Sequence, residues 1–137
     1  MSKSDIFHKI KRKRFYLNKI NAIKINKEPS DNTISINQDA SYSILEKSKD
    51  RLSVKVNTKF FVEPEALFSI ELEYIIEFEL NEEITDKEIE DNINEMITPV
   101  GGVSSYIVAS ITKEMLGSYL ILPPTLKVSK VEKEKHI

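Results

Sequence analysis

The most regular feature of the chain is the alternation of apolar and polar residues between positions 68 and 80. A helix would scatter these apolar residues around its circumference, whereas a strand gathers them on one face. The alternation therefore predicts a strand over Phe68–Leu80 with one buried and one acidic face. The apolar positions are Phe68, Ile70, Leu72, Tyr74, Ile76, Phe78 and Leu80, and the acidic positions are Glu71, Glu73, Glu77 and Glu79.

Weaker alternations predict three strands before this one. The run Phe15–Ile25 alternates at its ends and slips by one residue in its middle, which indicates a strand with a bulge. An amphipathic helix could also place Ile20 and Ile23. The next strand is expected over Thr33–Leu45 and the third over Leu52–Val62, which ends in consecutive apolar residues. The apolar pairs of the second strand are Ile34 with Ile36 and Tyr42 with Ile44.

Two helices are predicted after the strands. Thr85 is suited to the N-cap position of the first helix, and Glu88 three residues later completes a capping box. The run Thr98-Pro99-Val100-Gly101-Gly102 predicts a break after that helix. The second helix is therefore expected over Val103–Leu116, with Gly117 placed to end it.

These elements give the order β-β-β-β-α-α, followed by a short extended segment over Tyr119–Leu122. Sequential strands joined by short turns favour a meander. The predicted fold is therefore α+β, a four-stranded antiparallel sheet with the helices packed on one face. The 137 residues fit one domain. We assign it to residues 15–126, between a basic N-terminal arm at 1–14 and a charged C-terminal tail at 127–137.

The composition narrows the classes of protein that fit. Lys and Arg number 20 and Asp and Glu 22, and this near balance argues against a chain dedicated to nucleic acid. The absence of cysteine excludes disulfides and thiolate metal ligands. No apolar run approaches the roughly 18 residues that a membrane-spanning helix needs. No secretory signal is recognisable, so we expect a cytoplasmic protein without membrane insertion.

Residues for catalysis, or for binding a metal or a cofactor, are not identifiable. His8 and His136 lie near the ends of the chain, so a metal site or a histidine-based triad has no support. Glutamates at strand spacing favour a solvated sheet face over a catalytic carboxylate pair. We therefore predict that the protein is not an enzyme and takes no cofactor.

Three segments follow one another in an order known from one protein family. The opening run Phe15-x-Leu17-x-x-Ile20 has the spacing of that family's first strand, and Phe68–Tyr74 stands where its last sheet strand lies. The most specific segment comprises Pro99, the helix Val103–Leu116, Gly117 and Leu120-Ile121-Leu122-Pro123-Pro124. Together these segments resemble the bacterial export chaperone SecB and its relatives, over roughly residues 15–126.

This resemblance implies a homo-oligomer, a dimer or a tetramer, that holds unfolded polypeptides in apolar grooves without ATP. It also implies docking of a partner through acidic positions, here Glu28, Glu71 and Glu73. Two departures bear on export. Lys24 stands at an acidic position with which the export form docks its motor ATPase, and the amphipathic C-terminal helix is cut short. A chaperone for a dedicated client therefore fits as well as an export chaperone.

The chain also holds more apolar surface than one sheet face and two helices need. The consecutive residues Phe60-Phe61-Val62 cannot all face inward, and Ile75 interrupts the acidic face of its strand. Exposed apolar patches often mark interfaces, and unfolded chains can be held by strand addition. The alternative is that the candidate residues are ordinary core. We predict a polypeptide-binding groove lined by Ile34, Ile36, Tyr42, Ile44, Tyr119, Leu120 and Leu122.

Two other functions stay open. A structural or adaptor protein would use the apolar patch only to assemble an oligomer. The basic cluster Lys9–Arg14 could bind nucleic-acid phosphates, or it could simply be a solubilising arm.

Overall fold

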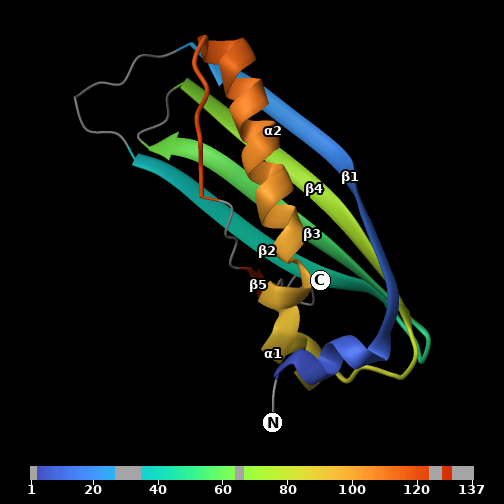
Figure 1. Cartoon of the computed structure of the whole chain (residues 1–137). Coiled ribbons are helices and arrows are strands. Elements are labelled where there is room, and N and C mark those ends of the chain that lie inside the picture. Colours follow the sequence, from blue (N-terminus) through green and yellow to red (C-terminus); the bar gives the residue numbers. More distant parts are fainter. Residues whose placement is uncertain (1–2, 27–34, 64–66, 124–127, 131–137) are drawn as a thin grey trace, which may run out of the picture.

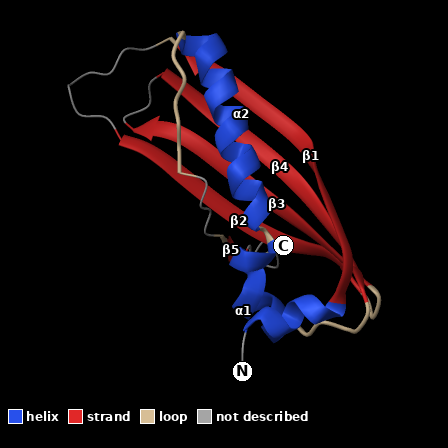
Figure 2. Cartoon of the chain, viewed as in Figure 1, coloured by secondary structure: helices blue, strands red, loops and turns tan. Residues whose placement is uncertain are grey.

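The computed structural model describes residues 3–26, 35–63, 67–123 and 128–130. A twisted sheet carries its helices on one face, and the fold is α+β as predicted (Figures 1 and 2). In chain order the elements are η1 (Lys3–Lys9, a 3-10 helix), β1 (Ile10–Ile25), β2 (Ser35–Lys47), β3 (Arg51–Glu63), β4 (Leu67–Leu80), α1 (Asp86–Met96), α2 (Thr98–Leu116) and β5 (Ser129–Lys130).

The strand order differs from the predicted meander. The sheet runs β1-β4-β3-β2-β5, so β1 pairs with β4 and not with β2, and a short fifth strand lies parallel to β2. Only β2, β3 and β4 follow one another as a meander; β1 beside β4 completes a Greek-key order. Charge favours this pairing, because Arg12 lies opposite Glu79 and Arg14 opposite Glu77.

The alternation of β4 has the predicted consequence. All seven of its apolar positions from Phe68 to Leu80 are buried, and they form the centre of the core with the buried residues of β3. Phe61 faces away from Phe60 and Val62, as expected for consecutive strand residues, and lies under the ammonium of Lys59. Ile75 is a correction, since cross-strand neighbours Tyr16 and Lys55 leave it only 8% exposed.

β1 is longer than predicted and carries the predicted bulge. It begins at Ile10 instead of Phe15, so the basic residues after Ile10 lie in the sheet. Its register with β4 shifts between Leu17 and Lys19, where the sequence pattern slips by one residue. The shift brings Leu17, Ile20 and Ala22 opposite Tyr74, Leu72 and Ile70, on the helix-bearing face of the sheet.

The two helices are almost continuous. α2 begins at Thr98 and not at the predicted Val103. Pro99 is tolerated in the first turn because the backbone N–H that proline lacks would have no hydrogen-bond partner at that position. Val100 and Gly101 are buried in that first turn, so packing outweighs the low helix propensity of glycine. At its other end α2 stops as predicted, with Gly117 in the left-handed conformation at φ 83°.

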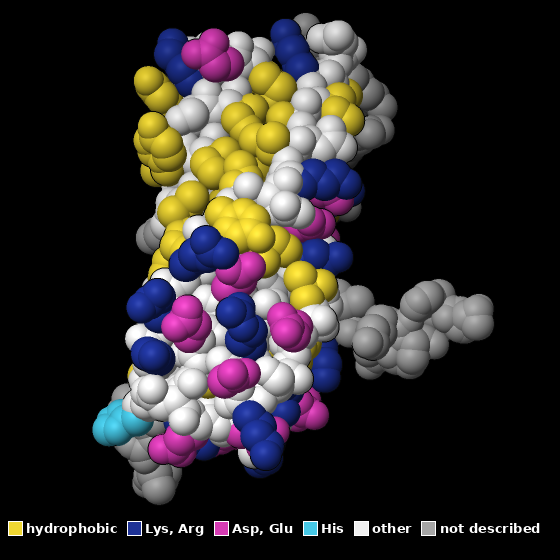
Figure 3. Space-filling view, turned by 90° about the vertical axis from the view of Figure 1, so that its right-hand side faces the viewer, with side chains coloured by type: hydrophobic (Ala, Val, Ile, Leu, Met, Phe, Trp, Pro, Cys, Tyr) yellow, Lys and Arg dark blue, Asp and Glu magenta, His cyan; other side chains and the backbone are white. Residues whose placement is uncertain are grey.

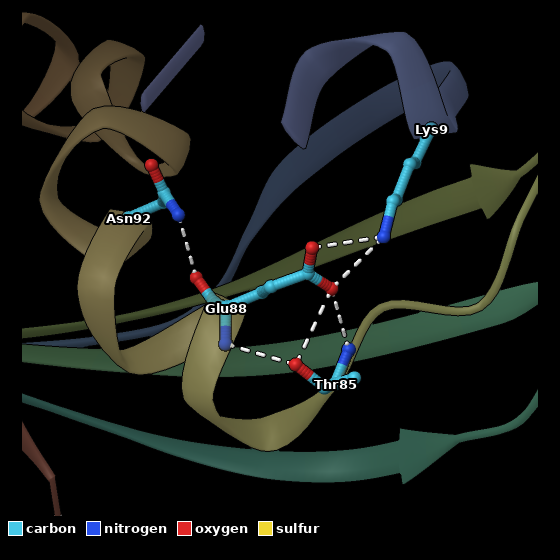
Figure 4. A network of polar contacts seen from close by, with 4 residues as sticks. All are labelled: Lys9, Thr85, Glu88 and Asn92. Carbon is cyan, nitrogen blue, oxygen red and sulfur yellow. Dashed lines mark hydrogen bonds and ion pairs between the residues drawn. The ribbon is translucent and has the colours of Figure 1, made fainter. Parts of the chain in front are cut away.

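The predicted capping box opens α1 and also joins it to the N-terminal helix η1 (Figure 4). The Thr85 hydroxyl accepts a hydrogen bond from the Glu88 N–H at 3.1 Å, and the Glu88 carboxylate accepts one from the Thr85 N–H at 2.9 Å. Lys9 Nζ lies 2.8 and 3.1 Å from the two oxygens of that carboxylate. The bond from Lys9, helped by Thr85, lowers the pKa of Glu88 below its ordinary value of 4.5.

Replacing Glu88 by Gln should lower stability in a pH-dependent way. The folded pKa of Glu88 lies below its unfolded value, so its stabilising effect is present above about pH 4.5 and is lost as the pH falls through the folded pKa. We expect the variant to unfold at lower urea concentration than the wild type at pH 7, with the difference shrinking at pH 3. Glu90→Gln, at an exposed site on the same helix, is the control. An equal difference at both pH values would contradict this assignment.

Candidate polypeptide-binding surface

α2 lies across β4 and is fixed there by a buried polar contact. Ser104 Oγ donates a hydrogen bond to the hydroxyl of Tyr74 at 3.1 Å, and burial raises the pKa of Tyr74. The ring of Phe15 on β1 lies beside Tyr74, with ring centroids 6.3 Å apart. The helix therefore has two flanks over the sheet, one toward β1 and one toward β2 (Figure 1).

The flank toward β2 is covered by the chain itself. After Gly117 the backbone turns back and runs beside α2, on the side away from β1 (Figure 1). The Leu120 N–H donates to Thr112 Oγ1 at 2.9 Å, and Ser105 Oγ donates to the Leu122 carbonyl at 2.7 Å. Leu120 and Leu122 pack partly buried against the core.

The flank toward β1 presents apolar side chains to solvent. On β1, Leu17 is 37% and Ile20 48% exposed. On α2, Val103, Ile107 and Ile111 recur every four residues, away from Ser105 and Thr112, and are only partly buried. We call these five residues the β1–α2 surface. Figure 3, which looks at this side of the molecule, shows hydrophobic side chains gathered in its upper half, with charged side chains at the top edge and over the lower half.

β1 is also the outer strand of the sheet, beyond β4. An outer strand presents backbone N–H and C=O groups on which another extended chain can pair. On its second face, away from the helices, β1 exposes Tyr16 (42%) and Ile23 (52%). Within the described residues the strand thus combines a backbone edge that no other strand covers with apolar residues on both faces, which is the combination that promotes association.

Around Glu71 and Glu73, the face of the sheet opposite the helices is polar and of mixed charge. Glu71 lies across from Lys59, and Glu73 accepts a hydrogen bond from Asn18 at 2.7 Å. Both glutamates line a hollow of about 500 Å³ together with Lys19, Lys59 and Asp39. The acidic positions proposed for partner docking are therefore balanced by lysines, and this surface is not an acidic patch.

The basic cluster is partly neutralised in the same way. Lys9 pairs with Glu88, Arg12 with Glu79 and Arg14 with Glu77. Hydrogen bonding to Glu77 raises the pKa of Arg14. Three cations of the cluster thus face carboxylates, which weakens the case for phosphate binding through Lys9–Arg14.

The predicted groove residues do not share one surface. Tyr42 is a correction: it is 3% exposed because it faces the helices opposite Val56, and burial raises its pKa. Ile44 is partly buried against the core, and Ile36 is 41% exposed. Tyr119 is 64% exposed, but Leu120 and Leu122 face inward.

Two predicted residues, Ile34 and Glu28, lie outside the described residues. The β1–α2 surface was not predicted, although one signal pointed to it. The slip in the pattern of Phe15–Ile25 sends Leu17 and Ile20 to the same face, and α2, which lies over β4, leaves both partly exposed. The exposure of Leu17 and Ile20 also depends on the pairing of β1 with β4, which places β1 at the edge of the sheet.

The described part of the chain contains no group of three or more His, Cys, Asp or Glu residues placed to hold a metal ion. Within the same residues, no helix has the length and apolar character needed to cross a membrane.

Comparison with known proteins gives a fold and no sequence family. No protein-family model and no curated protein matches the chain. The SecB-like chaperone Rv1957 of Mycobacterium tuberculosis, solved in complex with a ChAD peptide from the Rv1956 HigA1 antitoxin, superposes with a TM-score of 0.71 at 9% identity, over 88% of this chain and 93% of that one. A protein of unknown function from Streptococcus agalactiae gives 0.47 at 14% identity, over 82% of this chain and 95% of that one. The chain therefore has a SecB-like fold.

Proposed function

We propose that this protein binds unfolded or partly folded polypeptides as an ATP-independent chaperone, and does not catalyse a reaction. The observation that carries the proposal is the β1–α2 surface, where Leu17 and Ile20 are 37% and 48% exposed beside a row of apolar residues on α2. Contiguous apolar surface on a folded chain is typical of an interaction site. As the outer strand of the sheet, β1 adds backbone groups that can pair with an extended sequence.

The energy scale suits a protein that must release what it binds. Burial of apolar area contributes about 25 cal/mol per Å², so each half-exposed aliphatic residue contributes on the order of 1 kcal/mol when a client covers it. A handful of such contacts, offset by the ordering of a loose chain, gives reversible binding. No ATP-driven step is required for release on this scale.

The fold supports the same class of function. The SecB-like protein of M. tuberculosis was solved with a peptide bound, so this architecture is compatible with peptide binding. We extend peptide binding to this chain as a proposal, with either an export substrate or one dedicated client as its cytoplasmic partner. The mixed charge around Glu71 and Glu73 favours the dedicated client, because a motor that docks on an acidic face would also meet Lys59 and Lys19.

Replacing Ile20 by Glu should weaken client binding at least tenfold. The change removes an apolar contact and places a charge where the client must lie, and 1.4 kcal/mol already corresponds to tenfold in affinity. Suppression of the aggregation of a reduced, unfolding client protein measures the effect, together with the affinity for a permanently unfolded polypeptide.

Leu45→Glu is the matched control, because Leu45 is 52% exposed on β2, away from β1. We expect it to retain wild-type binding. Equal activity of the wild type and Ile20→Glu would remove the β1–α2 surface from the site. A wild type that binds no unfolded chain at all would refute the chaperone function.

Self-assembly is a second candidate function, and β1 specifically favours it. The strand is 16 residues long, lies at the sheet edge and exposes Tyr16 and Ile23 on the face away from the helices. Long apolar edges in proteins are normally covered. We propose that β1 pairs with a second copy of the chain, giving a dimer or tetramer whose joined sheets keep Ile20 on the helix-bearing side.

Joint replacement of Tyr16 and Ile23 by Glu should convert the assembly to monomers, since like charges would then face each other across the paired edges. Light scattering of the wild type and the variant gives the masses. The same measurement with an unfolded polypeptide separates the two functions, because a chaperone gains mass and a purely structural oligomer does not. A wild type that is monomeric at tens of micromolar would exclude assembly through β1.

A further inference from the structure

The segment Ser118–Pro123 is bound to the rest of the molecule as an extended peptide would be. Its side chains alternate, with Tyr119 (64%) and Ile121 (73%) exposed while Leu120 and Leu122 pack against the core. This period of two is that of an extended strand, yet the segment pairs with no strand of the sheet. It lies against a helix.

Besides this packing, α2 holds the backbone of the segment at two points. Thr112 accepts from the Leu120 N–H and Ser105 donates to the Leu122 carbonyl, so the segment runs antiparallel to the helix. Ser105 and Thr112 are two helical turns apart on one flank of α2. Neither bond depends on the identity of the residue that is held, because each engages a main-chain atom.

Residues 128–130, farther along the chain, make similar contacts. The Val128 N–H donates to Asn94 Oδ1 at 3.1 Å, and β5 pairs parallel with β2 at Ser41 and Tyr42. Two main-chain bonds to helix hydroxyls therefore hold residues 118–123, and one bond to an amide oxygen and a short β pairing hold residues 128–130. These are contacts that any polypeptide can offer.

We propose that the β2 flank of α2 is a second polypeptide groove, occupied by the chain's own residues 118–123 as a tethered competitor. The groove fits an extended peptide with apolar residues at alternate positions, which would take the places of Leu120 and Leu122 and bond to Ser105 and Thr112. The proposal rests on the proposed chaperone function. It adds the sequence pattern of the client and a competition between the client and residues 118–123 for the groove.

The covalent link between α2 and residues 118–123 determines the affinity that a client needs in order to displace them. A segment joined by a short linker acts at an effective concentration in the millimolar range, so a free peptide of equal intrinsic affinity displaces it only at comparable concentration. Weakening the segment must therefore strengthen the binding of a free peptide. If the segment were instead part of the binding site for a free peptide, removing the Leu120 side chain would weaken the binding of that peptide.

The test uses the full-length chain and a labelled synthetic peptide with the sequence of residues 117–123, Gly-Ser-Tyr-Leu-Ile-Leu-Pro. Leu120→Ser should bind this peptide at least threefold more tightly than the wild type. Ile121→Ser, at the neighbouring outward position, should match the wild type. Adding Thr112→Val to Leu120→Ser should abolish the gain, and adding Ile20→Glu on the other flank should preserve it.

A second measurement needs no variant. Hydrogen exchange of the Leu120 amide in the wild type should speed up in excess peptide, because displacement frees it from Thr112. Affinity that falls or stays unchanged in Leu120→Ser, or slower exchange of that amide, would overturn the inference while leaving binding at the β1–α2 surface intact. A gain with this peptide in a protein that binds no unfolded client would sustain the groove and refute the chaperone function.

Discussion

One helix is too narrow to cover this sheet. Four strands about 4.8 Å apart have outer axes about 15 Å from each other, whereas an α-helix with its side chains is about 10 Å across. α2 is fixed over β4 by the contact between Ser104 and Tyr74, so apolar side chains remain on both of its flanks. The distribution of apolar groups on the surface therefore depends on how far each flank of α2 is covered by other parts of the chain.

The two flanks of α2 are covered to different extents. Toward β2, the segment after α2 folds back and covers the apolar floor with Leu120 and Leu122. Toward β1, the described chain supplies no such cover, and Leu17 and Ile20 are left exposed. Backbone pairing with β4, helped by charge pairs such as that of Arg14 with Glu77, holds β1 in place without burying it. The result is a strand fixed in the sheet whose apolar side chains stay accessible, which is what a binder of loose chains requires.

The sequence allowed the local features to be predicted. The β4 alternation, the Thr85–Glu88 capping box, the bulge in β1 and the glycine that ends α2 are all encoded within a few residues and are found in the structure. Features that depend on a distant partner were missed. The placement of β1 depends on charges far along the chain in β4, since Arg14 pairs with Glu77, 63 residues later. Tyr42 alternates as a groove residue would, but its burial is decided by where the helices lie. For the same reason the β1–α2 surface could not be predicted from the sequence and was recognised only in the structure.

The proposed function requires that a client lies against β1 on the side of α2. A photoreactive amino acid in place of Ile20, irradiated with an unfolded polypeptide present, tests this most directly, with the same probe at Leu45 for comparison. We expect covalent adducts with the polypeptide from position 20 and few from position 45. Adducts in equal yield from both positions, or only from position 45, would contradict this expectation.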